Sequence, residues 1–143
     1  MHRIFVYGSL KEGHCNFHVN QGRRVAGDFV TVERYALYIL GDENLPWLVP
    51  AATDGHFVVG QLFEVDDQTL ANMDQLERID EALWYRRVAI DVQARAGGAG
   101  GAGGPAWVYL GNHERLQVEA VRAGPVAEYT AALAAAHPLA LDD

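Results

Sequence analysis

The residues best suited to chemistry form a turn close to the start of the chain. The turn, Tyr7-Gly8-Ser9-Leu10, follows the apolar run Ile4-Phe5-Val6, which has the composition of a short buried strand. Successive backbone N–H groups in such a turn form a concavity that attracts an anion. Gly8 has no Cβ, so a ligand can approach the backbone closely. The turn is therefore a candidate anion-binding loop.

A carboxylate much later in the chain, Glu77, is the candidate partner of this loop. The apolar pattern predicts a helix over about 67–79, and Glu77 falls between Leu70 and Met73 on its apolar face. Loss of solvent at such a position raises the pKa of a carboxyl group and prepares it to accept a proton. The alternative is a glutamate at a helix end that forms an ion pair with a nearby arginine, Arg78, Arg86 or Arg87. The sequence leaves both interpretations open.

The elements that must position these residues are mostly β-strands. Apolar runs predict strands at 3–7, 57–65, 84–92 and 106–111. Residues 23–40 predict two strands, or one bent strand with bulges near Gly27-Asp28 and after Glu33. Such bends suit a small barrel better than a flat sheet. Besides the helix at 67–79, for which Asp66 and Asp67 offer N-caps, a final helix is predicted from Pro125 to about Ala136.

Two segments are predicted to be loops. The first, Gly41 to Pro50, contains two prolines, and its Trp47 plugs one end of the core, forms a wall of a pocket, or does both. The second is the glycine-rich run 97–104, which buries no apolar surface and is expected to be a flexible hairpin loop. No Gly-Lys-Ser/Thr follows that run, so a phosphate-binding role is rejected.

A second group of potential ligands lies just after the candidate turn. His14 and His18 have the spacing that places two imidazoles on one helical face, and Cys15 lies between them. No further ligand group follows at a metal-site spacing, so we favour a solvated loop edge over a metal site. Arg86 and Arg87 are expected to form surface ion pairs rather than to bind a substrate.

Length and charge limit the classes of function. A chain of 143 residues fits a single domain, here taken as 1–143, with a full core. The net charge of -8 argues against nucleic acids and anionic membranes as partners, because both require a basic surface. The one cysteine excludes an intrachain disulfide, and the start of the chain lacks the apolar region of a signal peptide. We therefore expect a cytoplasmic protein; its oligomeric state stays open.

Several short motifs together resemble a known family, the γ-glutamylcyclotransferase-like superfamily, and within it the γ-glutamylamine cyclotransferases and AIG2-like proteins. The motifs lie within roughly residues 1–112, and their order and spacing carry the resemblance more than any one of them. They are Val6-Tyr7-Gly8-Ser9-Leu10-Lys11, the group Gly13, Asn16 and His18, Asn44-Leu45-Pro46-Trp47, Asp74 with Leu76-Glu77, and Tyr85-Arg86. The glycine-rich run and the predicted C-terminal helix lie outside it.

The resemblance implies a fold, a reaction and a site. The implied fold is α+β, a small mixed β-barrel with flanking helices. Tyr7, Gly8, Ser9 and Leu10 would bind the substrate, and Glu77 would be the general base. In a γ-glutamyl amide the α-amine attacks the side-chain carbonyl, which closes 5-oxoproline and releases an amine. This step requires neither a nucleophile from the protein nor a metal or organic cofactor.

Three alternatives to an amine-releasing enzyme are considered. A γ-glutamylcyclotransferase acting on γ-glutamyl amino acids or on a γ-glutamyl-protected intermediate would use the same residues. A non-catalytic binding module on the same fold would not require Glu77. A serine hydrolase is disfavoured, because Ser9 lies outside a Gly-x-Ser-x-Gly elbow.

Overall fold

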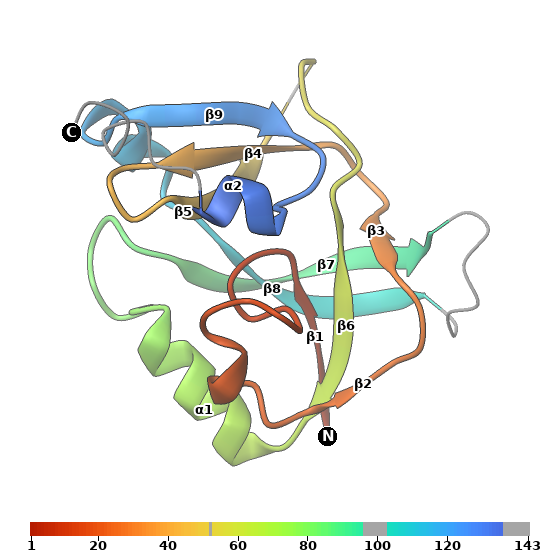
Figure 1. Cartoon of the computed structure of the whole chain (residues 1–143). Coiled ribbons are helices and arrows are strands. Elements are labelled where there is room, and N and C mark those ends of the chain that lie inside the picture. Colours follow the sequence, from red (N-terminus) through yellow and green to blue (C-terminus); the bar gives the residue numbers. More distant parts are fainter. Residues whose placement is uncertain (52, 96–102, 136–143) are drawn as a thin grey trace.

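A closed barrel of five strands lies at the centre of the structure (Figure 1), a computed structural model that describes residues 1–51, 53–95 and 103–135. Around the barrel the strand order is β1-β8-β7-β3-β6, and β6 pairs again with β1. The strands are β1 (His2–Val6), β2 (Arg23–Arg24), β3 (Phe29–Thr31), β4 (Tyr35–Leu40), β5 (Leu45–Pro50), β6 (Val59–Val65), β7 (Arg86–Ala94), β8 (Gly104–Leu110) and β9 (Val121–Val126). The helices are η1 (Phe17–Val19), α1 (Asp67–Leu76), η2 (His113–Gln117) and α2 (Ala131–Ala135).

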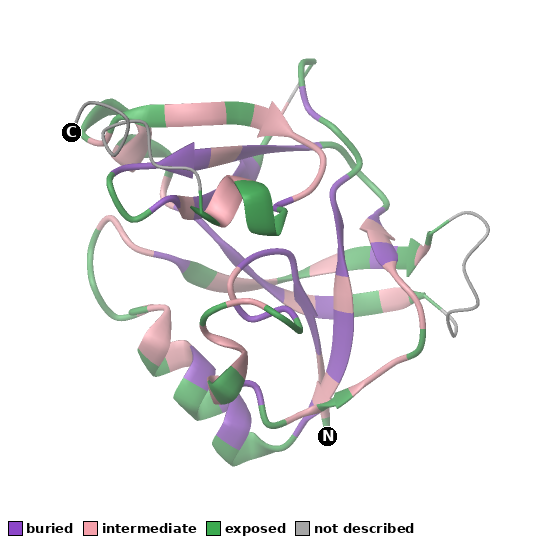
Figure 2. Cartoon of the chain, viewed as in Figure 1, coloured by how far each residue is buried: buried purple, intermediate pink, exposed green. Residues whose placement is uncertain are grey.

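The barrel is mixed because β1 lies between strands of opposite direction. It runs antiparallel to β6, with Ile4 opposite Phe63, and parallel to β8, with Ile4 opposite Trp107. The other pairs in the barrel are antiparallel, and β2 extends the edge of β6. Buried residues run along β1, β4 and β6 (purple in Figure 2), so β1 emerges from the centre of the core. The predicted α+β fold with a small mixed barrel is confirmed.

A second sheet, in the order β5-β4-β9, corrects one prediction about the chain. Residues 41–50, predicted to be a loop, form a short turn and then β5, which pairs with β4 from Leu45 to Pro50. Its two prolines did not prevent a strand, because β5 lies at the sheet edge and a missing N–H is tolerated there. Trp47 is fully buried, and its indole N–H donates to the Asn112 carbonyl at 2.8 Å. It therefore plugs the core.

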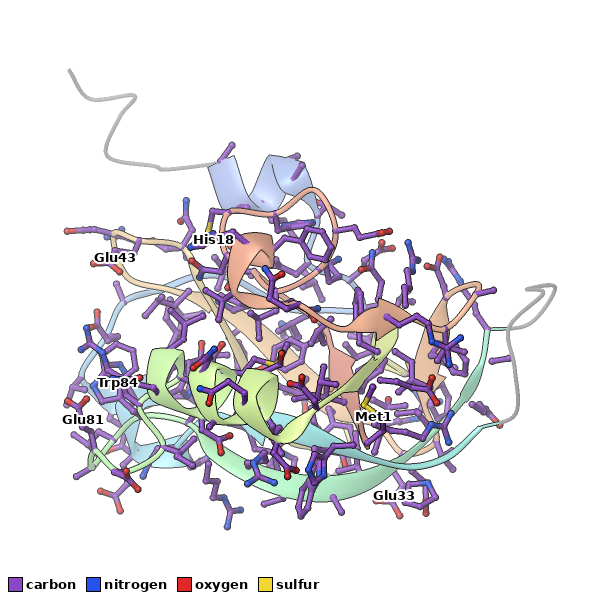
Figure 3. All side chains as sticks on the ribbon, turned by 90° about the horizontal axis from the view of Figure 1, so that it is seen from below. Met1, His18, Glu33, Glu43, Glu81 and Trp84 are labelled. Carbon is purple, nitrogen blue, oxygen red and sulfur yellow. The ribbon has the colours of Figure 1, made fainter. Side chains whose placement is uncertain are left out.

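The predicted helix from Pro125 to about Ala136 is also wrong. Pro125 lies in β9, the other edge strand of the second sheet, and the helix α2 begins six residues later at Ala131. Proline fits the first turn of a helix and an edge strand equally well, since both leave its missing N–H without consequence. Seen from below, α2 lies over the loop that carries η1 (Figure 3).

Helix α1 is close to the prediction and ends earlier. Asp66 is its N-cap, and its carboxylate accepts a hydrogen bond from the Thr69 N–H at 2.8 Å. The helix ends at Leu76, with Glu77 as the C-cap, and Arg78 has the positive φ of 55° that turns the chain away.

The segment 23–40 contains three strands, β2, β3 and β4, where two strands or one bent strand were predicted. The breaks lie at the predicted places, around Gly27, which has a φ of 88°, and after Glu33. Of the glycine-rich run 97–104, residues 97–102 lie outside the described residues, and Gly104 opens β8. In the described part of the chain, no helix is long and apolar enough to cross a membrane.

Candidate active site

The predicted turn leaves the barrel directly from β1 and is held by its own hydrogen bonds. The Lys11 N–H donates to the Gly8 carbonyl at 3.1 Å. Asn16 donates twice to Ser9, from its backbone N–H to the Ser9 carbonyl at 3.0 Å and from Nδ2 to Ser9 Oγ at 2.8 Å. Among the described residues, no acceptor is bonded to the N–H groups of Ser9 and Leu10. Two backbone donors therefore stay available at this turn.

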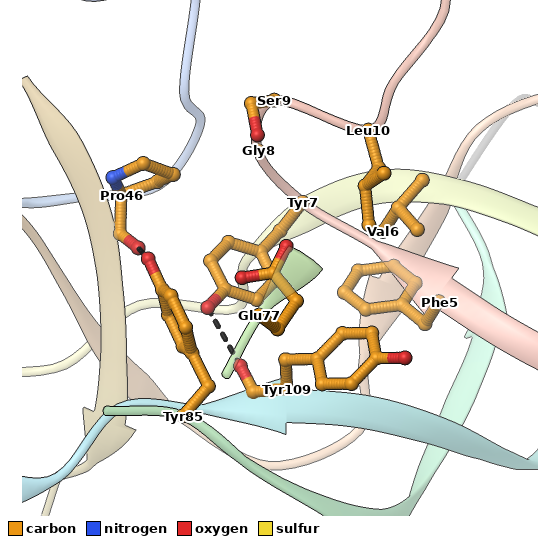
Figure 4. A pocket seen from close by; sticks show the side chains of 10 residues that line it. All are labelled: Phe5, Val6, Tyr7, Gly8, Ser9, Leu10, Pro46, Glu77, Tyr85 and Tyr109. Atoms are coloured by element: carbon orange, nitrogen blue, oxygen red, sulfur yellow. Dashed lines mark hydrogen bonds between the residues drawn. The ribbon is translucent and has the colours of Figure 1, made fainter. Parts of the chain in front are cut away.

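Glycine is required at position 8 by a close neighbour and not by its backbone angles. A Cβ added to Gly8 would lie 2.5 Å from Cγ of Pro46 on β5. Pro46 in turn lines the inner pocket, whose walls come from the turn, α1 and strands of both sheets (Figure 4). The lining residues are Phe5, Val6, Tyr7, Gly8, Ser9, Leu10, Pro46, Glu77, Tyr85 and Tyr109. The structure thus brings the predicted loop residues and Glu77 together around one pocket.

The carboxyl group of Glu77 lies beside the Tyr7 ring and below the turn (Figure 4). Burial raises its pKa to about 8. No arginine in the described ranges forms an ion pair with it: Arg87 pairs with Asp74, and Arg78 Nε lies 3.9 Å from Oε2 of Glu81. Within the described residues, the Glu77 side chain makes no hydrogen bond or ion pair. The sequence left open whether Glu77 is a buried carboxyl with a raised pKa or pairs with an arginine. The structure shows the buried carboxyl, unpaired among the residues described.

Tyrosine side chains form the rigid walls of the inner pocket. The Tyr7 hydroxyl donates to the Tyr109 carbonyl at 2.6 Å, and the Tyr85 hydroxyl donates to the Pro46 carbonyl at 2.6 Å. Burial, and secondly the charge of Glu77, raises the pKa of Tyr7 well above its usual value. Both phenols therefore stay protonated near neutral pH and hold the backbones of β8 and β5 in place.

An ion pair fixes the last turn of α1, which carries Glu77, against the barrel. Arg87 on β7 contacts Asp74 through two hydrogen bonds, at 2.8 Å and 3.2 Å. The Tyr109 hydroxyl on β8 donates to the same carboxylate at 2.7 Å. Arg87 also lies over the Trp107 ring, 4.3 Å from its centroid. The expected ion pair of Arg87 is thus present, although it is mostly buried rather than on the surface, and among the described residues Arg86 forms none. Together with Tyr109, the Asp74–Arg87 pair connects α1 to β7 and β8 one helical turn before Glu77.

A larger cavity of about 390 Å³ adjoins the inner pocket and shares Ser9, Pro46, Glu77 and Tyr85 with it. Its other walls come from the loop after the turn, from the β4–β5 turn and from the segment after α1. Glu77 is therefore one of the residues that line both spaces.

The histidine and cysteine side chains that suggested a metal site point to different partners. The His14 ring packs on Tyr129, 5.6 Å between centroids, and His18 Nδ1 lies 3.2 Å from the Cys15 carbonyl. In the described part of the chain, His, Cys, Asp and Glu form no group suited to a metal ion. Cys15 is exposed and lines the larger cavity.

Sequence reasoning missed several residues of the site. Pro46, Tyr85 and Tyr109 line the inner pocket, and Tyr129 lines the larger cavity. Asn16 shapes the turn. Periodicity marks these tyrosines as core residues, and only the pairing of distant strands shows which core residues face a cavity. Pro46, Tyr85 and Asn16 carried a usable signal, since each lies within a motif that supported the resemblance.

Comparisons with known proteins place the chain in a family. The family model described as gamma-glutamyl cyclotransferase, AIG2-like, matches residues 4–129. A protein of Rattus norvegicus named gamma-glutamylaminecyclotransferase is 36% identical over 138 residues, which covers 83% of this chain and 91% of the relative. A Homo sapiens protein with the same name is 36% identical over 107 residues, which covers 71% of this chain and 69% of the relative.

Solved structures give the same result. The crystal structure of an AIG2-like protein from Mus musculus superposes with a TM-score of 0.71 and 31% identity, covering 91% of this chain and 88% of that one. The structural likeness thus extends over most of the chain, as the sequence match does. The chain belongs to the gamma-glutamyl cyclotransferase, AIG2-like family.

Proposed function

We propose that this protein is a γ-glutamylamine cyclotransferase that releases 5-oxoproline and a free amine from γ-glutamyl amides. The α-amine nitrogen of the substrate attacks its own γ-carbonyl carbon, so a new C–N bond closes the five-membered ring. The γ-amide C–N bond then breaks. The α-ammonium nitrogen loses two protons in becoming the ring N–H: one passes to the leaving nitrogen to give the amine, and the other protonates that amine or is released to water. The family and the names of the relatives support this reaction.

The main support for the proposal is that the carboxyl group of Glu77 is buried and has a raised pKa. Its carboxyl group is unpaired within the described residues, and burial raises its pKa to about 8. A base of this strength can accept the proton of the α-ammonium and return it to the leaving amine, a contribution of roughly 10²–10⁴-fold. Because attack is intramolecular, the protein must hold the substrate folded rather than supply a nucleophile.

We place the substrate's α-carboxylate on the turn. The Ser9 and Leu10 N–H groups supply two donors, and no arginine or lysine side chain is among the described residues that line the inner pocket. Arg87 is engaged by Asp74, and Arg86 is exposed on β7. The turn amides are therefore the anion site that the inner pocket offers beside Glu77.

The proposal is tested by incubating the protein with a panel of γ-glutamyl amines and γ-glutamyl amino acids and measuring 5-oxoproline. We expect release from the amines, and we expect Glu77→Gln to abolish it while the variant stays folded, with a thermal midpoint at neutral pH no lower than that of the parent. Glu33→Gln is the matched control, because Glu33 is exposed and lines neither the inner pocket nor the larger cavity.

The outcomes separate the candidate functions. Release from γ-glutamyl amino acids alone would identify a γ-glutamylcyclotransferase, which uses the same reaction with an amino acid as the leaving group. No release from any member, with 5-oxoproline still bound, would identify a binding module. Activity of Glu77→Gln within tenfold of the parent would remove Glu77 as the base. A crystal soaked with 5-oxoproline should show its carboxylate on the turn; a carboxylate on Arg86 or Arg87 would overturn the site.

A further inference from the structure

The segment that follows β9 is fastened across the open end of the site. Lys11 is only 5% exposed, and its Nζ donates to the Tyr129 carbonyl at 2.5 Å. The Tyr129 hydroxyl donates to the Asn44 carbonyl at 2.7 Å, and Asn44 Nδ2 donates to the Ala134 carbonyl at 3.1 Å. Three hydrogen bonds thus fix this segment to the loop after the turn and to the β4–β5 turn. These hydrogen bonds therefore define the position of the segment.

A cavity of about 290 Å³ lies between this segment and the loop that follows the turn Tyr7-Gly8-Ser9-Leu10. It shares Ser9, Cys15, Glu43 and Tyr129 with the larger cavity that reaches Glu77. Its outer wall is formed by the alanines of α2, Ala131, Ala134 and Ala135. The family match ends at Tyr129, so this wall lies outside the matched residues.

The chemistry of the cavity lining indicates what fits there. The α2 wall is entirely alanine and suits an aliphatic chain. Glu43 lines both outer cavities and is the one carboxylate among the described residues of the α2 cavity, where burial lowers the pKa of His14 and so favours its neutral form. An aliphatic chain with a terminal cation therefore matches both features.

We propose that the cavity under α2 is a distal leaving-group subsite that takes an aliphatic amine chain and favours one with a terminal ammonium beside Glu43. This inference rests on the proposed function, because the chain enters from Glu77. The γ-glutamyl group occupies the inner pocket, the scissile amide lies at Glu77, and the amine extends past Tyr129 along α2. Residues of α2 then determine which amines are released.

The steric part is tested with two alanines of the same helix. Ala131 and Ala132 are both exposed, but only Ala131 is among the residues lining the α2 cavity. We compare kcat/KM for γ-glutamylmethylamide and γ-glutamyl-n-hexylamide. Ala131→Phe should lower the hexylamide-to-methylamide ratio by about tenfold or more, and Ala131→Leu should lower it less. Ala132→Phe should leave the ratio unchanged.

The charge part uses two neighbouring acids of the β4–β5 turn. Asp42, which contacts Arg122 at 2.7 Å, does not line the α2 cavity, whereas Glu43 does. Glu43→Gln should reduce the preference for a hexyl chain with a terminal ammonium over the plain hexyl chain by about twofold to fivefold, as expected for an exposed charge pair. Asp42→Asn should not, and added salt should weaken the preference in the parent protein.

The outcomes distinguish this inference from the proposed function. Failure of the parent protein to release 5-oxoproline even from γ-glutamylmethylamide would contradict the proposed function itself. Normal release from the methylamide with equal ratios for the parent and a folded Ala131→Phe would overturn the subsite alone. An equal ratio change in Ala132→Phe would also overturn it, because the effect would then come from α2 in general. Folding is checked by the thermal midpoint.

Discussion

Gly8 and Pro46 approach each other so closely that a Cβ on Gly8 would lie 2.5 Å from the proline Cγ. The contact joins the turn Tyr7-Gly8-Ser9-Leu10 to β5, an edge strand of the second sheet. We therefore expect Gly8→Val to reduce 5-oxoproline release severely, because the two γ-methyl groups must displace either the turn or Pro46. Overpacking of this kind costs about 1–3 kcal/mol of stability. Kinetics and chemical unfolding of the purified variant measure both effects.

Removing the neighbour gives the control for this prediction. In Gly8→Ala combined with Pro46→Gly, the added Cβ meets no proline ring, so the double variant should recover part of the stability lost in Gly8→Ala. A double-mutant cycle measures this coupling. Additive effects of the two changes would show that the contact does not explain why glycine occupies position 8.

Ser9→Ala tests the turn from the opposite side. If the substrate's carboxylate binds backbone N–H groups, loss of the Ser9 hydroxyl removes only the 2.8 Å hydrogen bond from Asn16 Nδ2. We expect a mild effect, about 0.5–1.5 kcal/mol of stability or transition-state binding. A loss of kcat/KM greater than about a hundredfold, with an unchanged thermal midpoint, would instead give the hydroxyl a direct role.

The barrel and the position of Glu77 could be predicted because each has a local signal. Strand-forming runs separated by glycine indicate a bent sheet, and Glu77 interrupts an apolar helical face. The assignment of Tyr7, Gly8, Ser9 and Leu10 to substrate binding came from the resemblance and stays a prediction. Their placement around one pocket with Glu77 is what the structure adds.

The remaining errors arise where one local signal fits two structures. Prolines suggested a loop at 41–50 and a helix start at Pro125, yet both segments are edge strands that tolerate a missing N–H. The Asp74–Arg87 pair joins residues from a helix and a strand, and Tyr109 reaches the same carboxylate from another strand. Only the register of the folded barrel brings these three residues together, so no periodicity reveals it.

We expect Asp74→Ala to weaken catalysis through the position of Glu77. The side chains of Asp74 and Arg87 are 18% and 23% exposed, so removing the carboxylate leaves Arg87 and the Tyr109 hydroxyl without their partner. Stability should fall by about 1–3 kcal/mol. The rate constant kcat should fall while KM changes little, because the turn is untouched.

The pH profile separates positioning from a general loss of stability. A freed helix end gives the Glu77 carboxyl more solvent, which lowers its pKa and moves the midpoint of kcat/KM to lower pH. Asp74→Asn keeps an acceptor for Tyr109 and should retain more activity than Asp74→Ala. A profile with an unmoved midpoint in Asp74→Ala would limit the ion pair to a structural role.

The buried carboxyl of Glu77 should also make folding stability depend on pH. Its pKa is about 8 in the folded protein against an ordinary value of 4.5, so the folded state binds more protons between these values. The contribution of Glu77 to folding stability is therefore fully present below about pH 4.5, and it is lost as the pH rises towards 8. At 1.36 kcal/mol per pKa unit the upper limit is roughly 5 kcal/mol, which solvent access at the pocket reduces.

Comparison of the parent with Glu77→Gln isolates this effect, because all other titrating groups are common to both. The amide stays neutral, so the stability of the variant relative to the parent should increase from about pH 5 to 8 and then level off. Denaturant unfolding across this range measures the difference. Over the same range kcat/KM of the parent should rise as Glu77 becomes a carboxylate able to accept the proton. A stability difference independent of pH would mean that the Glu77 carboxyl titrates alike in the folded and unfolded protein, and the base would then lack its raised pKa.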